Sequence, residues 1–168
     1  MLNDEVRQAI ENGMKEAARI GAETAKAELD AARRAQRDRQ RQNTKLILKQ
    51  YRTMRFACQN SVNDCLTYLG DENIRPESTF RTFTLLRHVE RMLDLYLHIC
   101  EETGREDHMR RYRTIMAVYI DGDSSPDVET VAAAGHVDRR TVYKDIDAAV
   151  ETLSALFFGI DALRLEDG

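Results

Sequence analysis

The chain of 168 residues contains no tryptophan, only two prolines and only eight glycines. Proline interrupts helices and glycine supplies many of the turns that sheets need, so their scarcity favours long helices over a many-stranded sheet. No apolar run approaches the roughly 20 residues of a membrane-spanning helix, and the N-terminus lacks the apolar segment of a signal peptide. The composition therefore predicts an all-α protein without a membrane segment.

Cysteine is also scarce. Cys58, Cys65 and Cys100 are odd in number and show neither a disulfide framework nor zinc-site spacing. Such isolated thiols are typical of a reducing compartment. We therefore expect a cytoplasmic protein.

Signatures of catalysis and of cofactor binding are missing as well. The four histidines, at positions 88, 98, 108 and 136, belong to no metal-binding motif. His98 and Cys100 stand two residues apart on a predicted helix, so their side chains point in different directions. The chain has no Walker A loop, no nucleophile elbow and no dinucleotide fingerprint. We therefore expect that the protein is not an enzyme and that it holds neither a cofactor nor a metal.

The most distinctive segment is residues 131–146, VAAAGHVDRRTVYKDI. It has the layout of a helix-turn-helix, with a short Ala-rich helix, a turn at residues 135–137 and a second helix opened by Asp138, a favoured N-cap. We place the whole motif at residues 128–158, its first helix opened by Ser125-Pro126. In such motifs the first turns of the second helix enter the DNA major groove. The candidate DNA-binding residues are therefore Arg139, Arg140, Thr141, Tyr143 and Lys144.

A helical wheel separates the two faces of this second helix. Arg140 and Lys144 lie one turn apart on the polar face, which becomes acidic further along at Asp147 and Glu151. Groove contacts are therefore expected only in the first two turns. A capped surface helix with an incidental basic turn is the plainer interpretation. The predicted core of the motif is Val131, Val137, Val142, Ile146 and Leu153.

Residues 141–163, TVYKDIDAAVETLSALFFGIDAL, resemble the end of ArpU/RinA-type phage transcriptional regulators, and NTKLILKQYR at 43–52 is similar to another segment of such proteins. The resemblance implies a helix-turn-helix like region 4 of sigma factors and a phage or prophage activator of late genes, working beside RNA polymerase in the bacterial host cytoplasm. One departure is that Gly135 stands one place before the usual turn glycine. His136 would therefore have to adopt the left-handed conformation.

Charge is distributed unevenly along the chain. Residues 31–60 contain nine basic residues against Asp38 alone, whereas the segment from 128 onward contains eight acidic and four basic residues. Because phosphate attraction supplies most non-specific DNA affinity, the acidic motif alone should bind weakly. The basic stretch is either a solvated helical surface or a source of phosphate contacts. Its candidates are Arg33, Arg34, Arg37, Arg39, Arg41, Lys45, Lys49 and Arg52.

The remaining chain is expected to form helices separated by short loops. Residues 1–42 predict a charged N-terminal helix, projecting or partly disordered, because no large aliphatic residue appears between Leu29 and Leu46. A coiled coil is possible, but sustained heptads of large apolar residues are missing. Residues 43–168 form the helical domain, with helices expected at 44–69, 79–103 and 106–120. At the end of the motif, Phe158 points to the polar side of its helix. Either the helix breaks near Gly159 and folds Ile160 and Leu163 back onto the domain, or the apolar cluster of Phe157, Phe158 and Ile160 packs against a second copy in a homodimer.

The favoured function is sequence-specific DNA binding in transcription regulation. A DNA-packaging subunit similar to a small terminase is an alternative, because such proteins also combine a helix-turn-helix with oligomerisation helices. A third possibility is a module that binds a sigma factor or polymerase without reading DNA.

Overall fold

The computed structural model describes residues 4–67, 76–122, 124 and 126–159, and these contain helices but no strand, which confirms the all-α class. None of the described helices is long and apolar enough to cross a membrane. The chain divides into two compact units, Met1–Arg39 and Gln40–Gly168.

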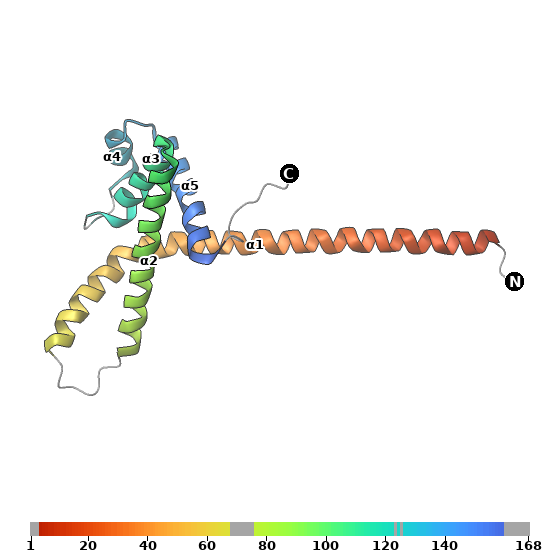
Figure 1. Cartoon of the computed structure of the whole chain (residues 1–168), viewed down its shortest axis with the longest axis horizontal. Helices are drawn as coiled ribbons and strands as arrows, with labels where there is room; N and C mark the ends of the chain where they lie inside the picture. Colours follow the sequence, from red (N-terminus) through yellow and green to blue (C-terminus); the bar gives the residue numbers. More distant parts are fainter. Residues whose placement is uncertain (1–3, 68–75, 123, 125, 160–168) are drawn as a thin grey trace. The chain divides into compact units, whose positions relative to one another are not determined.

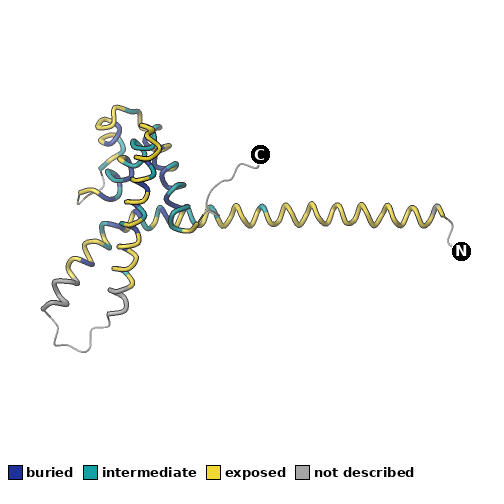
Figure 2. The backbone as a smooth tube through the Cα atoms, viewed as in Figure 1, coloured by how far each residue is buried: buried dark blue, intermediate teal, exposed yellow. Residues whose placement is uncertain are grey.

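Helix α1 (Asp4–Thr67) runs through the first unit and into the second (Figure 1). The sequence predicts two helices here, within residues 1–42 and at 44–69, and this division is wrong. Between Ala22 and Thr67 the sequence has neither proline nor glycine, so nothing locally ends the helix near Asn43. Within the first unit nearly every described side chain is exposed (Figure 2).

The second unit continues with α2 (Pro76–Thr103), α3 (Glu106–Ile115), the π-helical turn η1 (Met116–Ile120), α4 (Val128–Ala134) and α5 (Arg139–Phe158). Helix α2 begins three residues earlier than expected, at Pro76, a residue that suits a first helical turn. It ends before Gly104, whose φ of +60° requires the left-handed region. The helix expected at 106–120 is present, but its last turn is η1.

Helices α3 and α5 pack on each other and on α2, and α4 packs on α5. The buried line of α2 is Leu86, Val89, Leu93, Tyr96 and Cys100, and α1 adds Leu48, Tyr51 and Cys58. Cys58 and Cys100 are free thiols. All of these residues belong to one continuous hydrophobic core.

The motif contributes to the same core. Val131, Val142, Ile146 and Leu153 are buried and Val137 is half-buried against them, which confirms the predicted set. Helix α5 ends at Phe158, followed by Gly159 with φ +92°, so the helix end that the first of the two alternatives requires is present. Phe158 is 39% exposed, as its place on the polar side predicts. The expected fold-back of Ile160 and Leu163 lies outside the described residues.

Candidate nucleic-acid interface

One aspartate caps the N-terminus of each helix in the candidate site. Asp127 accepts the backbone N–H of Thr130 at 2.7 Å, and Asp138 accepts that of Thr141 at 2.9 Å. Hydrogen bonds from the Thr130 side chain and backbone lower the pKa of Asp127 below its ordinary value, and bonds from the Thr141 backbone and side chain lower that of Asp138. The Asp138 cap was predicted from the sequence. The expected Ser125-Pro126 cap is wrong, because α4 begins only after Asp127.

The turn between α4 and α5 depends on one unusual backbone conformation. His136 has φ +50°, in the left-handed region, and is the residue for which the sequence predicted it. The N–H of His136 donates to Ala133 O at 3.2 Å, and that of Val137 to Ala132 O at 3.0 Å. Two carbonyl groups at the end of α4 are thereby satisfied, and the chain is turned into α5.

His136→Gly is expected to stabilise the fold by about 0.5–1 kcal/mol, because glycine adopts a positive φ without steric cost. The side chain of His136 is exposed, so little packing is lost. Urea denaturation followed by circular dichroism measures the change. His136→Val is the control and should destabilise, because a β-branched residue resists this conformation. An equal midpoint for all three proteins would contradict the assigned turn.

The five predicted DNA-binding residues do not have the same environment. Arg140 and Lys144 are exposed, and within the described part of the chain neither forms an ion pair. Tyr143 is 51% exposed beside them. Arg139 instead pairs with Glu129 of α4 at 2.7 Å. Thr141 completes the helix cap, its hydroxyl donating to Asp138 at 3.0 Å.

Burial on the opposite side holds this basic face outward. Val142, Ala149 and Leu153 are fully buried on α5, so the helix cannot rotate without exposing them. Arg140 and Lys144 lie about half a turn of the wheel away from this face. The exposed basic face is therefore a fixed feature of the packed domain.

A buried ion pair also fixes the position of α5, and sequence reasoning missed it. Asp145 is buried, with its side chain 4% exposed, and accepts two hydrogen bonds from Arg110 of α3, at 2.7 and 3.1 Å. The two parallel bonds define the approach of the two helices. The available signal was an acidic residue three positions after Val142, on the face that packs on the core. Charged residues are rarely buried unless they are paired.

Three of the eight residues expected to contact phosphate instead bind groups of the second unit. Arg41 pairs with Glu151 at 2.9 Å and Lys45 with Asp147 at 2.7 Å, joining α1 to α5. Beside these pairs the buried Thr44 hydroxyl lies 3.2 Å from that of Ser154. The acidic end of the polar face of α5 is thus largely neutralised by α1.

Arg52 has a different role. Its guanidinium donates to the carbonyl oxygens of Ala117, Val118, Asp121 and Gly122, at distances of 2.6–3.3 Å. Two of these carbonyls belong to η1 and two to the loop directly after it. At the end of a helix the last carbonyls lack intrahelical partners, and the helix dipole favours a cation there. Arg52 therefore caps a helix end, and we do not include it in the candidate interface.

The other five phosphate candidates remain at the surface. Lys49 is exposed on α1 in the second unit. The first unit contains the other four, Arg33, Arg34, Arg37 and Arg39. The Arg33 guanidinium lies 4.0 Å from the carboxylate of Asp30.

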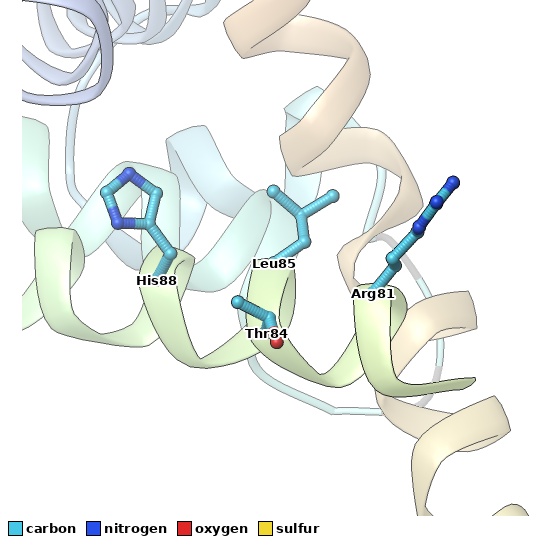
Figure 3. A pocket seen from close by; sticks show the side chains of 4 residues that line it. All are labelled: Arg81, Thr84, Leu85 and His88. Carbon is cyan, nitrogen blue, oxygen red and sulfur yellow. The ribbon is translucent and has the colours of Figure 1, made fainter. Parts of the chain in front are cut away.

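A shallow groove follows one side of α2. The side chains of Arg81, Thr84, Leu85 and His88 line it from successive turns of that helix (Figure 3). The His88 ring lies 5.7 Å from the ring of Phe157 of α5. The groove brings together no acid–base pair, and among the described residues no cluster of three potential metal ligands exists.

Comparison with protein-family models, with curated proteins and with solved structures finds no match to this chain. The site's geometry and the sequence resemblance are therefore the grounds for a functional proposal.

Proposed function

We propose that the chain is a sequence-specific DNA-binding regulator of transcription, and that the first two turns of α5 read the major groove. The observation that carries the proposal is the pair Arg140 and Lys144. Both project from a capped helix that is fixed in position, and neither side chain forms an ion pair with another described residue. Elsewhere in the second unit, Arg41, Lys45, Arg52 and Arg110 all have intramolecular partners.

The connection between α4 and α5 supports the same proposal. Residues 135–138 join the two helices, the length found in helix-turn-helix motifs, and α3 packs beneath α5 as a third helix. Ion pairs from α1 to Asp147 and Glu151 reduce the repulsion that these acids would exert on phosphate. The start of α5 is then the basic part of an otherwise acidic module.

The resemblance to ArpU/RinA-type regulators narrows the proposal to activation of phage or prophage late genes beside RNA polymerase. A packaging subunit would instead assemble into a ring. A polymerase-binding module would bind polymerase without DNA, and its binding would not depend on Arg140 and Lys144.

Arg140→Ala is expected to lower discrimination between specific and scrambled DNA by about 1–3 kcal/mol if the guanidinium reads a guanine. Lys144→Ala should weaken binding to both DNAs and reduce the salt dependence, as loss of a phosphate contact does. Titrations of the full chain measure both effects, using a duplex that the unaltered chain selects from a random-sequence pool.

Arg87→Ala is a control matched in charge and exposure, because the Arg87 side chain on α2 is 70% exposed, although its guanidinium lies 3.6 Å from the carboxylate of Glu90. It should bind both duplexes as the unaltered chain does. If Arg140→Ala and Lys144→Ala also leave both affinities unchanged, α5 is not the DNA-reading helix.

A further inference from the structure

The exposed helix of the first unit carries a regular line of apolar and small residues. Val6, Ile10 and Ile20 are 45%, 53% and 52% exposed. They belong to a set with alternating spacings of four and three residues, which we call the seam: Val6, Ile10, Gly13, Ala17, Ile20, Thr24, Ala27 and Ala31. That spacing is the heptad repeat of coiled coils, and it keeps the seam within an arc of about 100° on the helix. No bulky charged side chain interrupts it.

We propose that the seam packs against the seam of a second copy of this chain, with the two helices antiparallel. This inference does not depend on DNA binding, and it concerns a different surface from the Phe158 cluster. Pairing of this kind also accounts for the scarcity of large apolar residues along this helix, because half of the seam positions are glycine or alanine.

The sizes of the seam residues indicate the orientation. An antiparallel alignment that places Ile10 opposite Ala27 also places Val6 opposite Ala31, and Ile20 opposite Ala17. Gly13 then lies opposite Thr24. Every layer pairs a larger side chain with a smaller one, so the layers are of similar width and the helices can approach closely. A parallel alignment would instead pair Gly13 with Gly13 and Ile10 with Ile10, alternating gaps with crowded layers.

The charges beside the seam favour the same orientation. In the antiparallel alignment Arg7 of each copy flanks Glu28 of the other, whereas a parallel pair would bring Glu23 of one copy near Glu28 of the other. Glu16 and Glu23 also approach across the antiparallel pair. Both are already paired with Arg19 of their own chain, at 2.5 and 2.7 Å, which offsets their repulsion.

The larger charge pattern of the first unit is self-complementary as well. Residues 4–30 contain seven acidic and four basic residues, whereas residues 31–39 contain four arginines and Asp38. Antiparallel pairing places the basic end of each helix, at Arg33 and Arg34, beside the acidic start of the other, at Asp4. Parallel pairing would place like charges together at both ends.

Sedimentation equilibrium of the full chain tests the association. Ile20→Asp should weaken dimerisation by at least about tenfold, because it places carboxylates in two central layers. Leu29→Asp is the matched control, since Leu29 is 51% exposed on the opposite side of the same helix. It should dimerise as the unaltered chain does. A monomeric unaltered chain at about 100 μM, or equal effects of the two variants, would overturn the proposal.

Cysteine cross-linking tests the orientation. The double variant Ile10→Cys/Ala27→Cys should form an interchain disulfide under mild oxidation, because the two positions of one chain are about 26 Å apart along the helix and cannot pair internally. The two single variants should stay uncross-linked, like the unaltered chain, which controls for the native cysteines. Cross-linking of either single variant would show a parallel dimer and overturn the proposed alignment. Absence of cross-linking in the double variant would overturn it too.

Discussion

Val142→Asp is expected to prevent the second unit from folding stably. Val142 is fully buried in α5, so the substitution places a carboxylate in the hydrophobic core. Burying an unpaired charge costs several kcal/mol, here at least about 4, against the 5–15 kcal/mol that typically separates folded from unfolded domains. Urea denaturation followed by far-UV circular dichroism measures the loss.

The control for this prediction is the neighbouring residue. Tyr143→Asp introduces the same charge at a position that is 51% exposed, so its unfolding free energy should change by less than about 1 kcal/mol. The contrast between adjacent positions tests which face of α5 is packed. Two variants of equal stability would contradict the burial that orients Arg140 and Lys144.

Asp145→Ala should destabilise the fold by about 2–4 kcal/mol. The substitution removes both hydrogen bonds to Arg110 and leaves its guanidinium against the core. The Arg110 side chain is 35% exposed and can turn toward water, which places the expected cost below that of breaking a fully buried pair. Chemical denaturation at neutral pH measures the difference.

Asp147→Ala is the matched control for Asp145→Ala. Asp147 lies two residues further along α5 and forms an ion pair of the same 2.7 Å length with Lys45, but its side chain is 63% exposed. Exposed ion pairs contribute about 0–1 kcal/mol because water screens them and long side chains must be ordered. Equal losses for the two variants would show that burial does not determine the value of the Asp145–Arg110 pair.

The two predictions bear on the proposed function through the position of α5. Val142 fixes the rotation of the helix about its axis, and Asp145 fixes its approach to α3. A milder change such as Asp145→Asn can therefore leave the domain folded while displacing Arg140 and Lys144. Misplaced groups lose base discrimination before they lose phosphate attraction, because hydrogen bonds to base edges need defined geometry and charge attraction does not.

Local chemistry determined much of this protein from its sequence alone. The helix cap at Asp138, the left-handed residue His136, the break at Gly159 and the buried face of α5 all follow from the preferences of residues close together in the chain. The all-α class follows from the scarcity of proline and glycine. Such features depend on backbone conformation and on a period of 3.6 residues, which the order of residues specifies directly.

Tertiary structure alone decided which charges are free. Arg41, Lys45 and Arg52 appeared in the sequence as part of one basic stretch with Lys49, yet they meet acids of α5 or carbonyls near η1 that lie 65–110 residues away. The pairing of Asp145 with Arg110 likewise depends on the packing of α3 against α5. The availability of a charge depends on which partners the fold brings within a few ångströms, because Coulomb attraction and hydrogen bonding act through space and not along the chain.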